Sequence, residues 1–569
     1  MTSTERQAPA PGQAQLPAPN AAALLRRNAL DHTIAGRPAV RFEDKLWTHG
    51  EYVANARRWA NLFLARKPAG PFHVGVLLDN TPEYLFAFGG AALAGATVVG
   101  LNHTRRGDNL LRDIEHTHVA LVVTEPRHEE LLDPIAGRLP CDVLVVGSSL
   151  EDALMSVGED DPGLEPDVDT PWALIFTSGT SDAPKAVICS QRRLMVTGTR
   201  FSIMLGLTPD DVGYVAMPLF HSNAVMVGWA PSIVSGASVG LARRFTASGW
   251  LPDVRRYGAT WFNYTGKPLS YILATPEQPD DADNPLRVAF GNEGSPQVVA
   301  GFARRFGVEV IDAFGATEGG VAVQRTDTMA QGAMGLVGET VKVVDDEGHE
   351  RIRARFDTDG RLLNADECVG EIVNTGGVGP FEGYYNNAEA NERTTRFGWY
   401  WSGDLGYVDE AGYLYFAGRN AEWLRVDGEN FPAGPIESAV ARHPDVVVGA
   451  VYGVPDEQAG DQVMAALILR DGASFDPAAF ARWLDSQADV GPKWRPRYVR
   501  VSTELPSTAT NKIVKRTLVH QKFRSDRVGG DPVWVRNRGE GVYRPFTSDD
   551  EAALQLKFVD AGRERFWDL

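Results

Sequence analysis

The stretch that decides the fold is FTSGTSDAPKA, residues 176–186. It follows an apolar, strand-like run, WALIFT (172–177), and brings hydroxyl side chains, a glycine, a proline and a lysine together. Hydroxyl and backbone N–H groups donate hydrogen bonds to phosphate oxygens, and a lysine ammonium adds a point charge. The stretch therefore predicts a phosphate-binding loop, although a Ser/Thr/Gly cluster alone is also typical of an ordinary loop. Asp182 adds a negative charge in the middle, and we expect it to point to solvent.

Apolar runs alternate with helical stretches on both sides of this loop. Examples are FHVGVLL (72–78), VALVVTE (119–125) and VEVIDAFG (308–315). Such alternation is typical of βαβ units around a mainly parallel sheet. From 335 to 418 the strands become short and the turn sequences frequent, which predicts a small β-barrel or meander. The predicted class is α/β, with a large N-terminal domain of two layered αβ sheets plus the small barrel, and then a small mobile α+β domain.

The expected domain limits follow from these changes in pattern. They are a disordered tail at 1–20, an N-terminal domain at 21–418 (αβ sheets to about 334, barrel-like part from about 335), a hinge at 419–421 and a C-terminal domain at 422–569 with an extension after about 525.

The overall charge argues against a nucleic-acid partner. The 569 residues include 56 Lys+Arg and 74 Asp+Glu, a net charge of −18, whereas affinity for nucleic acid comes largely from neutralising phosphates. Between Lys493 and Arg527 basic residues dominate, which suggests either a solvated face or a site for polyanionic small molecules. The three cysteines have neither disulfide nor zinc-ligand spacing, as expected in a reducing cytoplasm.

One segment tests for a membrane span. Residues 84–101 carry no charge over a nearly spanning length, but they contain four glycines and four alanines. The pattern favours a buried helix at about 82–94 that turns at Gly95 into a strand.

Motif searches leave one rival class of enzyme. The chain has neither the Gly-rich P-loop pattern nor GxGxxG, so no motif indicates a P-loop kinase or a Rossmann dehydrogenase. GASVG (236–240) matches the GxSxG of serine hydrolases, with Ser238 as the nucleophile. A nucleophile elbow follows a strand and opens a helix, and here the predicted order is helix, then strand, which disfavours the hydrolase.

Further stretches follow the loop in a fixed order. They are MPLFHSN (217–223), FGNEGS (290–295), FGATEG (314–319), WYWSGDLGYVDEAGYLYFAGR (399–419), LRVDGEN (424–430) and STATNKIVKR (507–516). With them the chain resembles the adenylate-forming superfamily of acyl-CoA synthetases, luciferases and peptide-synthetase adenylation domains. PKA (184–186), LNHTRRGDNLL (101–111) and the tail 531–546 look like its fatty-acid-transport-protein and very-long-chain acyl-CoA synthetase branch.

The resemblance implies an activity and its cofactors. An acid would attack the α-phosphate of ATP to give acyl-AMP and pyrophosphate, and CoA would then displace AMP, with Mg²⁺ offsetting phosphate charge. The catalytic residues would be Lys185, Thr317, Glu318 (also the metal ligand) and Lys512. The ATP and AMP site would comprise Thr177, Ser178, Gly179, Thr180 and Ser181 at the phosphates, Gly291, Asn292, Glu293, Asp312, Ala313, Phe314 and Gly315 at adenine, and Asp404 and Arg419 at ribose. The CoA side would hold Arg425 and Gly428, and the hinge would be Ala421.

The acyl pocket is assigned by the same resemblance. Its residues would be His221, Asn223, Phe262, Tyr264 and Gly266. Amino-acid-activating relatives usually place an aspartate near this point, and Phe220 to Ser222 offer none, so a hydrophobic acid is expected. Long- or very-long-chain fatty acids and bulky sterol-like acids all fit.

Two alternatives stay open. The acceptor could be a carrier-protein phosphopantetheine, or the chain could be a lipid-binding or transport protein with reduced catalysis, since Asp182, Gln191 and Phe314 depart from the family pattern. The expected location is cytoplasmic. Peripheral contact with the inner membrane surface and the oligomeric state are left open.

Overall fold

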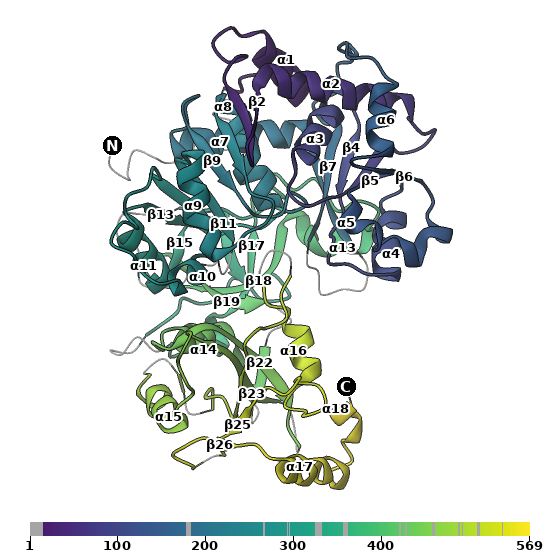
Figure 1. Cartoon of the computed structure of the whole chain (residues 1–569). Helices are drawn as coiled ribbons and strands as arrows, with labels where there is room; N and C mark the ends of the chain where they lie inside the picture. Colours follow the sequence, from purple (N-terminus) through teal and green to yellow (C-terminus); the bar gives the residue numbers. More distant parts are fainter. Residues whose placement is uncertain are drawn as a thin grey trace.

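The computed structural model describes most of the chain. The described residues are 15–177, 184–265, 268–292, 294, 296–324, 330, 333–356, 362–419, 423–426, 429–457, 461–487, 490–491, 493–508, 512–537 and 539–568. Two large sheets with their helices lie at the top of Figure 1, a third sheet lies beneath them, and the C-terminal domain lies at the bottom.

The two large sheets are mainly parallel, as the alternating pattern predicted. The seven-stranded sheet has the order β13 (Glu309–Asp312), β12 (Val288–Asn292), β11 (Trp261–Thr265), β9 (Val212–Val215), β10 (Ser238–Leu241), β1 (Pro38–Phe42) and β2 (Lys45–Thr48). The second large sheet has the order β6 (Asp142–Val145), β5 (Val119–Thr124), β3 (His73–Leu77), β4 (Thr97–Gly100), β7 (Pro171–Thr177) and β8 (Lys185–Ser190). Each sheet has one antiparallel pair, β1 with β2 and β7 with β8.

Helices connect these strands. They are α1 (Ala21–Leu30), α2 (His49–Ala65), α3 (Pro82–Ala94), α4 (Asp108–His116), α5 (Pro126–Glu129), η2 (Asp133–Arg138), α6 (Ser149–Met155), α7 (Gln191–Leu205), the π-helix η3 (Asn223–Trp229), α8 (Ala230–Ser235), α9 (Ala247–Tyr257), α10 (Pro268–Ala274) and α11 (Pro296–Phe306).

The largest core cluster joins both sheets through α2, α3 and α7. Trp172 of β7 stacks on Trp229 of η3, with ring centroids 5.6 Å apart, and its indole N–H donates to Phe88 O. Gly90 allows α2 and α3 to touch, since a Cβ there would lie 2.6 Å from Trp59 Cβ. A side chain at Gly90 would therefore force the two helices apart.

The third sheet is antiparallel and lies below the other two (Figure 1). Its order is β14 (Val323–Gln324), β15 (Ala333–Val337), β19 (Tyr413–Arg419), β18 (Tyr400–Val408), β17 (Gly370–Asn374) and β16 (Val341–Val344), with α12 (Ala365–Cys368), α13 (Ala388–Thr394) and η4 (Arg396–Gly398) in its connections. The expected change to short strands and turns is thus confirmed, beginning slightly before 335.

The C-terminal domain surrounds a five-stranded sheet. Its strands are β22 (Val446–Pro455), β23 (Asp461–Leu469), β24 (Tyr498–Val501), β25 (Val533–Val535) and β26 (Arg544–Pro545), beside the hairpin β20 (Trp423–Val426) and β21 (Glu429–Pro432). Its helices are α14 (Gly434–Ala441), α15 (Pro477–Ser486), α16 (Lys515–Gln521), α17 (Ser548–Asp560) and α18 (Glu564–Asp568). The part of the domain after 525 supplies two of these strands, β25 and β26.

Tyr271 of α10 links the N-terminal part to this domain. Its ring packs against the C-terminal cluster that contains Leu505 and Leu518. Burial, and then the charge of Glu504, raise the pKa of the Tyr271 phenol.

Several local predictions are confirmed. The uncharged segment 84–101 forms α3, ended by Gly95 in the left-handed conformation, and then β4. The GASVG stretch follows helix α8 and enters β10, and Ser238 is buried, so it has no nucleophile elbow. Within the described residues, no helix has the length and apolarity that a membrane crossing requires.

The predicted tail at 1–20 is too long. Ala18 is buried, and the Asn20 side chain accepts a hydrogen bond from Ala23 N at the start of α1. Leu16 also packs against the main core. Residues 15–20 therefore belong to the folded domain, because their apolar side chains find partners that are distant in sequence.

Buried histidines make the fold sensitive to acid. Burial lowers the pKa of His49, and it also lowers the pKa of His73, whose ring donates to Thr117 O. The unfolded chain then binds more protons below the ordinary pKa of about 6.5. The free energy of unfolding should therefore fall as pH drops from about 7.5 to about 5.5. Denaturant melts over this range should show it, and His73→Gln should flatten the slope; an unchanged slope would contradict the assignment.

Candidate active site

The predicted phosphate loop is the connection of a β-hairpin. Strands β7 and β8 pair antiparallel, and their last pair is Thr177 with Lys185. Both residues thus stand at the base of the loop. Ser178, Gly179, Thr180 and Ser181, together with Asp182, lie outside the described residues. The hairpin explains why a strand precedes the loop, since β7 fixes the direction in which the loop leaves the sheet.

The turn that carries Thr317 and Glu318 meets this hairpin through Tyr384. The Tyr384 hydroxyl donates to Glu318 Oε1 at 2.8 Å. Lys185 Nζ lies 5.5 Å from the centre of the same ring, within cation–π range. Two predicted catalytic residues far apart in sequence are therefore brought to one tyrosine.

A second tether holds the turn from α7. The Arg193 guanidinium donates to the carbonyls of Thr317 and Glu318, and also to Ile188 O on β8. Arg193 is 7% exposed, so its contacts are well sheltered from water. On the other side, the hydroxyls of Ser222 and Thr317 are hydrogen-bonded at 2.8 Å. The stretch expected to face the acid therefore touches the threonine expected at the α-phosphate.

The residues predicted for the adenine slot gather where β12 and β13 end. Asp312 Oδ2 accepts from the Tyr264 hydroxyl at 2.7 Å and from Gly294 N at 2.8 Å. Asn292 Nδ2 donates to Gly315 O, and Gly291 O accepts from Ala313 N. Parallel strands place such side chains at one edge of a sheet, where ligands bind in open α/β folds. Phe314 packs against the main core cluster, and Glu293 lies outside the described residues.

The two residues predicted to bind ribose stand on neighbouring strands. Asp404 of β18 is opposite Arg419 of β19 in the ladder, and Asp404 is buried. Its backbone N–H donates to Ser402 Oγ.

The predicted acyl-pocket residues divide between two faces of β11. Asn223 begins η3, and its amide donates to Tyr264 O and accepts from Asn263 Nδ2 at 2.6 Å. His221 lies just before it and is partly buried. Phe262 instead packs against Trp250 in the cluster beneath α9 and α11, so the structure does not bring it to His221 and Asn223. Gly266 lies outside the described residues.

A π-helix at this point is informative in itself. Such turns are rare in proteins and frequently lie at functional sites. Here it places an apolar run, Ala224 to Trp229, beside the group that includes Ser222 and Thr317.

Comparisons with known proteins identify the family of the chain. Residues 25–385 match the family model described as AMP-binding enzyme, and residues 435–512 match the AMP-binding enzyme C-terminal domain. The chain belongs to the AMP-binding enzyme family. It is 46% identical over 550 residues to a steroid-22-oyl-CoA synthetase of Rhodococcus jostii (strain RHA1), covering 95% of this chain and 98% of the relative. It is 44% identical over 506 residues to the medium/long-chain-fatty-acid–CoA ligase FadD17 of Mycobacterium marinum, covering 88% and 95%.

Solved structures confirm the fold of this AMP-binding enzyme. The anthranilate CoA ligase AuaEII, in complex with anthranoyl-AMP, aligns with a TM-score of 0.77 at 23% identity, covering 91% of this chain and 98% of that one. The resemblance to the adenylate-forming superfamily is thereby confirmed.

The C-terminal residues of the site are only partly described. Lys512 lies just before α16, where its carbonyl accepts from Thr508 N and Ser507 bridges Ile513. Among the described residues, no hydrogen bond or ion pair joins Lys512 to the Thr317–Glu318 turn. Ala421 and Gly428 lie outside the described residues, as does the side chain of Arg425.

The basic run from 493 to 527 is largely engaged within its own domain. Arg500 pairs with Asp531 at 2.7 Å, Lys515 with Glu437 at 3.1 Å, and Arg497 lies near Asp456. Lys522 donates to the carbonyls of Phe566 and Trp567 at the end of α18. The local excess of positive charge thus stabilises the domain and its extension, which weakens the case for a polyanion site.

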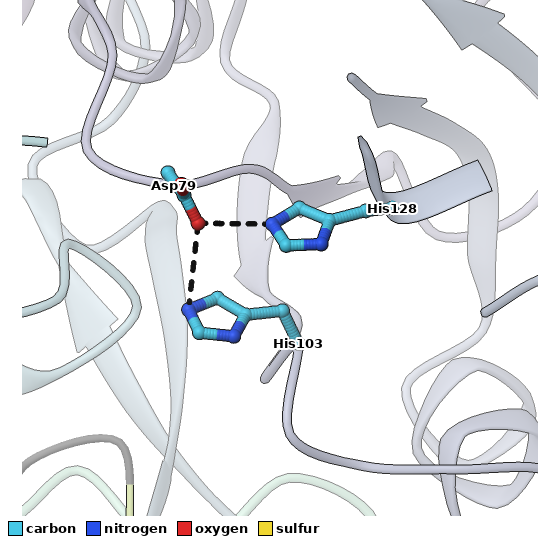
Figure 2. A group of neighbouring side chains, drawn as sticks. All are labelled: Asp79, His103 and His128. Carbon is cyan, nitrogen blue, oxygen red and sulfur yellow. Dashed lines mark hydrogen bonds and ion pairs between the residues drawn. The ribbon is translucent and has the colours of Figure 1, made fainter. Parts of the chain in front are cut away.

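A second group of side chains has the residue types of a metal site, but neighbouring arginines already offset the negative charge of its carboxylate. Asp79, His103 and His128 converge just beyond β3, and both imidazoles face one carboxylate oxygen (Figure 2). The other oxygen is bound by Arg127 and lies 3.7 Å from Arg243. Burial acts to raise the pKa of Asp79, but the hydrogen bond from His128 and the Arg127 charge outweigh it and lower the pKa. With two guanidinium groups already on Asp79, we assign the group to packing between the sheets.

Sequence reasoning missed the residues that hold the site together. Arg193 and Tyr384 lie outside the quoted motifs, and the turn that both contact is more than 60 positions away from each of them. Gln191, one of the expected departures from the family pattern, is fully buried, and its side chain joins Ala22 N to Ala92 O. This departure therefore has a structural explanation.

Proposed function

We propose that this enzyme is an ATP-dependent CoA ligase for a bulky hydrophobic acid. In the first step a carboxylate oxygen attacks the α-phosphorus of ATP and the bond to pyrophosphate breaks. In the second, the CoA sulfur attacks the acyl carbon, the thiol proton is released and AMP leaves. The hydrogen bond between Ser222 and Thr317 carries the proposal, because it joins the stretch expected to face the acid to the one expected at the α-phosphate.

Glu318 is suited to hold Mg²⁺. Within the described residues its carboxylate accepts one hydrogen bond, from Tyr384, and forms no ion pair. Mg²⁺ prefers such oxygen ligands together with substrate phosphates. When bound, the metal would offset charge on the phosphates. Arg193 would keep the turn in place, and Lys185 would face the outer phosphates.

The acid is expected to be hydrophobic and without an α-amine. No carboxylate occurs from Phe220 to Asn223, and η3 continues with apolar side chains. The likeness to a steroid-22-oyl-CoA synthetase and to a medium/long-chain fatty-acid ligase supports sterol side-chain acids and longer fatty acids as the first candidates. The ribose role of Asp404 and Arg419, the domain limits, the cytoplasmic location and peripheral membrane contact stay predictions.

The experiment is pyrophosphate release with a panel of acids and two acceptors. A steroid-22-oic acid, palmitate, laurate and octanoate are compared with acetate and an amino acid, with CoA, with a phosphopantetheinylated carrier protein, or with neither. We expect release with at least one large hydrophobic acid, and an acyl-CoA product that depends on CoA. Product with the carrier protein alone would establish the carrier-loading alternative. Tight acid binding without pyrophosphate release from any acid would indicate a lipid-binding protein.

A further inference from the structure

We propose that Tyr384 is a positioning residue that orients the Glu318 carboxylate for its metal and ties it to the base of the phosphate-binding hairpin. The inference rests on the proposed role of Glu318. It concerns a residue outside the predicted site, and it is carried by contacts that converge on one side chain.

Tyr384 contacts both charged partners at once. Its hydroxyl donates to Glu318 Oε1 at 2.8 Å, while Lys185 Nζ lies 5.5 Å from the ring centre. The side chain is 5% exposed and packs against Phe381, with ring centroids 4.9 Å apart. Because packing fixes the ring, the hydroxyl has little freedom to follow the carboxylate. The tyrosine therefore sets the position of Glu318 rather than the reverse.

The backbone around Tyr384 is bound to β8 itself. Tyr384 bridges Val187, Tyr385 N donates to Ala186 O, and Gly383 O accepts from Ile188 N. The side chains of the two neighbouring tyrosines have different partners. Tyr384 faces the Glu318 turn, whereas the Tyr385 hydroxyl is 2.8 Å from His118 Nδ1.

Both ends of β8 are tied to the same segment. Glu382 accepts from Ser190 N at 2.7 Å at the far end of the strand. Asn387 donates to Pro184 O at 3.1 Å, beside the phosphate loop. The hairpin and the Glu318 turn are thus both bound to one stretch of chain, residues 382–387. Within that stretch, Tyr384 contacts the Glu318 carboxylate.

Removing the hydroxyl should loosen Glu318 without moving the loop. In Tyr384→Phe the ring still covers Lys185, but Glu318 Oε1 loses its hydrogen bond. Residues that orient metal ligands typically change metal affinity by about 10- to 100-fold when altered. We expect an affinity loss of about 10-fold for the metal, and unchanged affinity for the nucleotide measured without metal.

The test measures metal binding directly. Mn²⁺ is titrated into the protein with α,β-methylene-ATP, and free Mn²⁺ is followed by electron paramagnetic resonance. Tyr384→Phe should bind Mn²⁺ about 10-fold more weakly than wild type, whereas Tyr385→Phe, the matched control on the opposite face, should bind as wild type. Thermal melts establish that both variants are folded. Binding by Tyr384→Phe equal to wild type would overturn the inference.

Glu318→Gln separates this inference from the function on which it rests. If that variant binds Mn²⁺ as wild type does, Glu318 is not the ligand and the metal assignment fails, whatever Tyr384 does. If Glu318→Gln loses Mn²⁺ while Tyr384→Phe does not, only the positioning role fails. An absence of acyl-CoA formation in a wild type that binds Mn²⁺ would overturn the proposed ligase activity alone.

Discussion

Glu318→Gln is expected to lower the rate of acyl-AMP formation by about 100- to 1000-fold, the range seen when one group that stabilises transition-state charge is removed. The amide keeps the size of the side chain and still accepts from the Tyr384 hydroxyl, but it no longer offers a charged ligand. The fold should survive, because in the structure the turn is held by Arg193 through backbone carbonyls. Pyrophosphate release at saturating acid, measured over a range of Mg²⁺ concentrations, gives the result.

The control for this prediction is Glu389→Gln, an exposed carboxylate on α13 whose contact is an ion pair with Arg393. It removes the same charge at an exposed position, close in sequence to Tyr384, and should leave the rate near wild type. A Glu318→Gln enzyme with the wild-type rate over the whole range of Mg²⁺ concentrations would remove Glu318 from the catalytic set.

The second large effect is expected at Lys512. Lys512→Ala should slow acyl-AMP formation by about 100- to 1000-fold, since a cation that meets developing charge at the α-phosphate would be lost. The reaction of preformed acyl-AMP with CoA should stay near the wild-type rate, because we expect the mobile C-terminal domain to turn at the predicted hinge and to carry Lys512 away for that step. Single-turnover assays of the two half-reactions separate these effects.

Arg516→Ala is the matched variant for Lys512, as it removes an exposed cation close by in the chain. It should leave both half-reactions unchanged. Equal losses in both half-reactions for Lys512→Ala would instead indicate that Lys512 has a structural role. The prediction that Lys512 acts only in acyl-AMP formation would then be wrong.

The sequence predicted best where chemistry and local structure coincide. The strand predicted at 172–177 is present as β7, and the structure adds that it forms a hairpin with β8, in which Thr177 and Lys185 are opposite each other. Gly291 and Asp312, two residues predicted for the adenine slot, lie opposite each other in the ladder of β12 and β13, because neighbouring parallel strands end at the same edge of the sheet.

Prediction fails where a contact depends on the packing of distant segments. Nothing in the surroundings of Arg193 or Tyr384 indicates that both reach one turn more than 60 positions away. The Asp79 group likewise gathers residues from three separate segments. Phe262 shows a different difficulty: WFNY has no alternation of polar and apolar residues, so the face of β11 that each side chain takes cannot be read from the pattern.

Because Tyr271 packs against the C-terminal cluster, the absorbance of its phenol can report whether the C-terminal domain is docked. In the arrangement described, burial and the nearby Glu504 hold the pKa of this phenol above its usual value. Should the C-terminal domain turn between half-reactions, the ring would lose both influences and its pKa would return toward about 10. The difference in phenolate absorbance between wild type and Tyr271→Phe, recorded at alkaline pH, would then report which orientation each ligand favours without any attached dye.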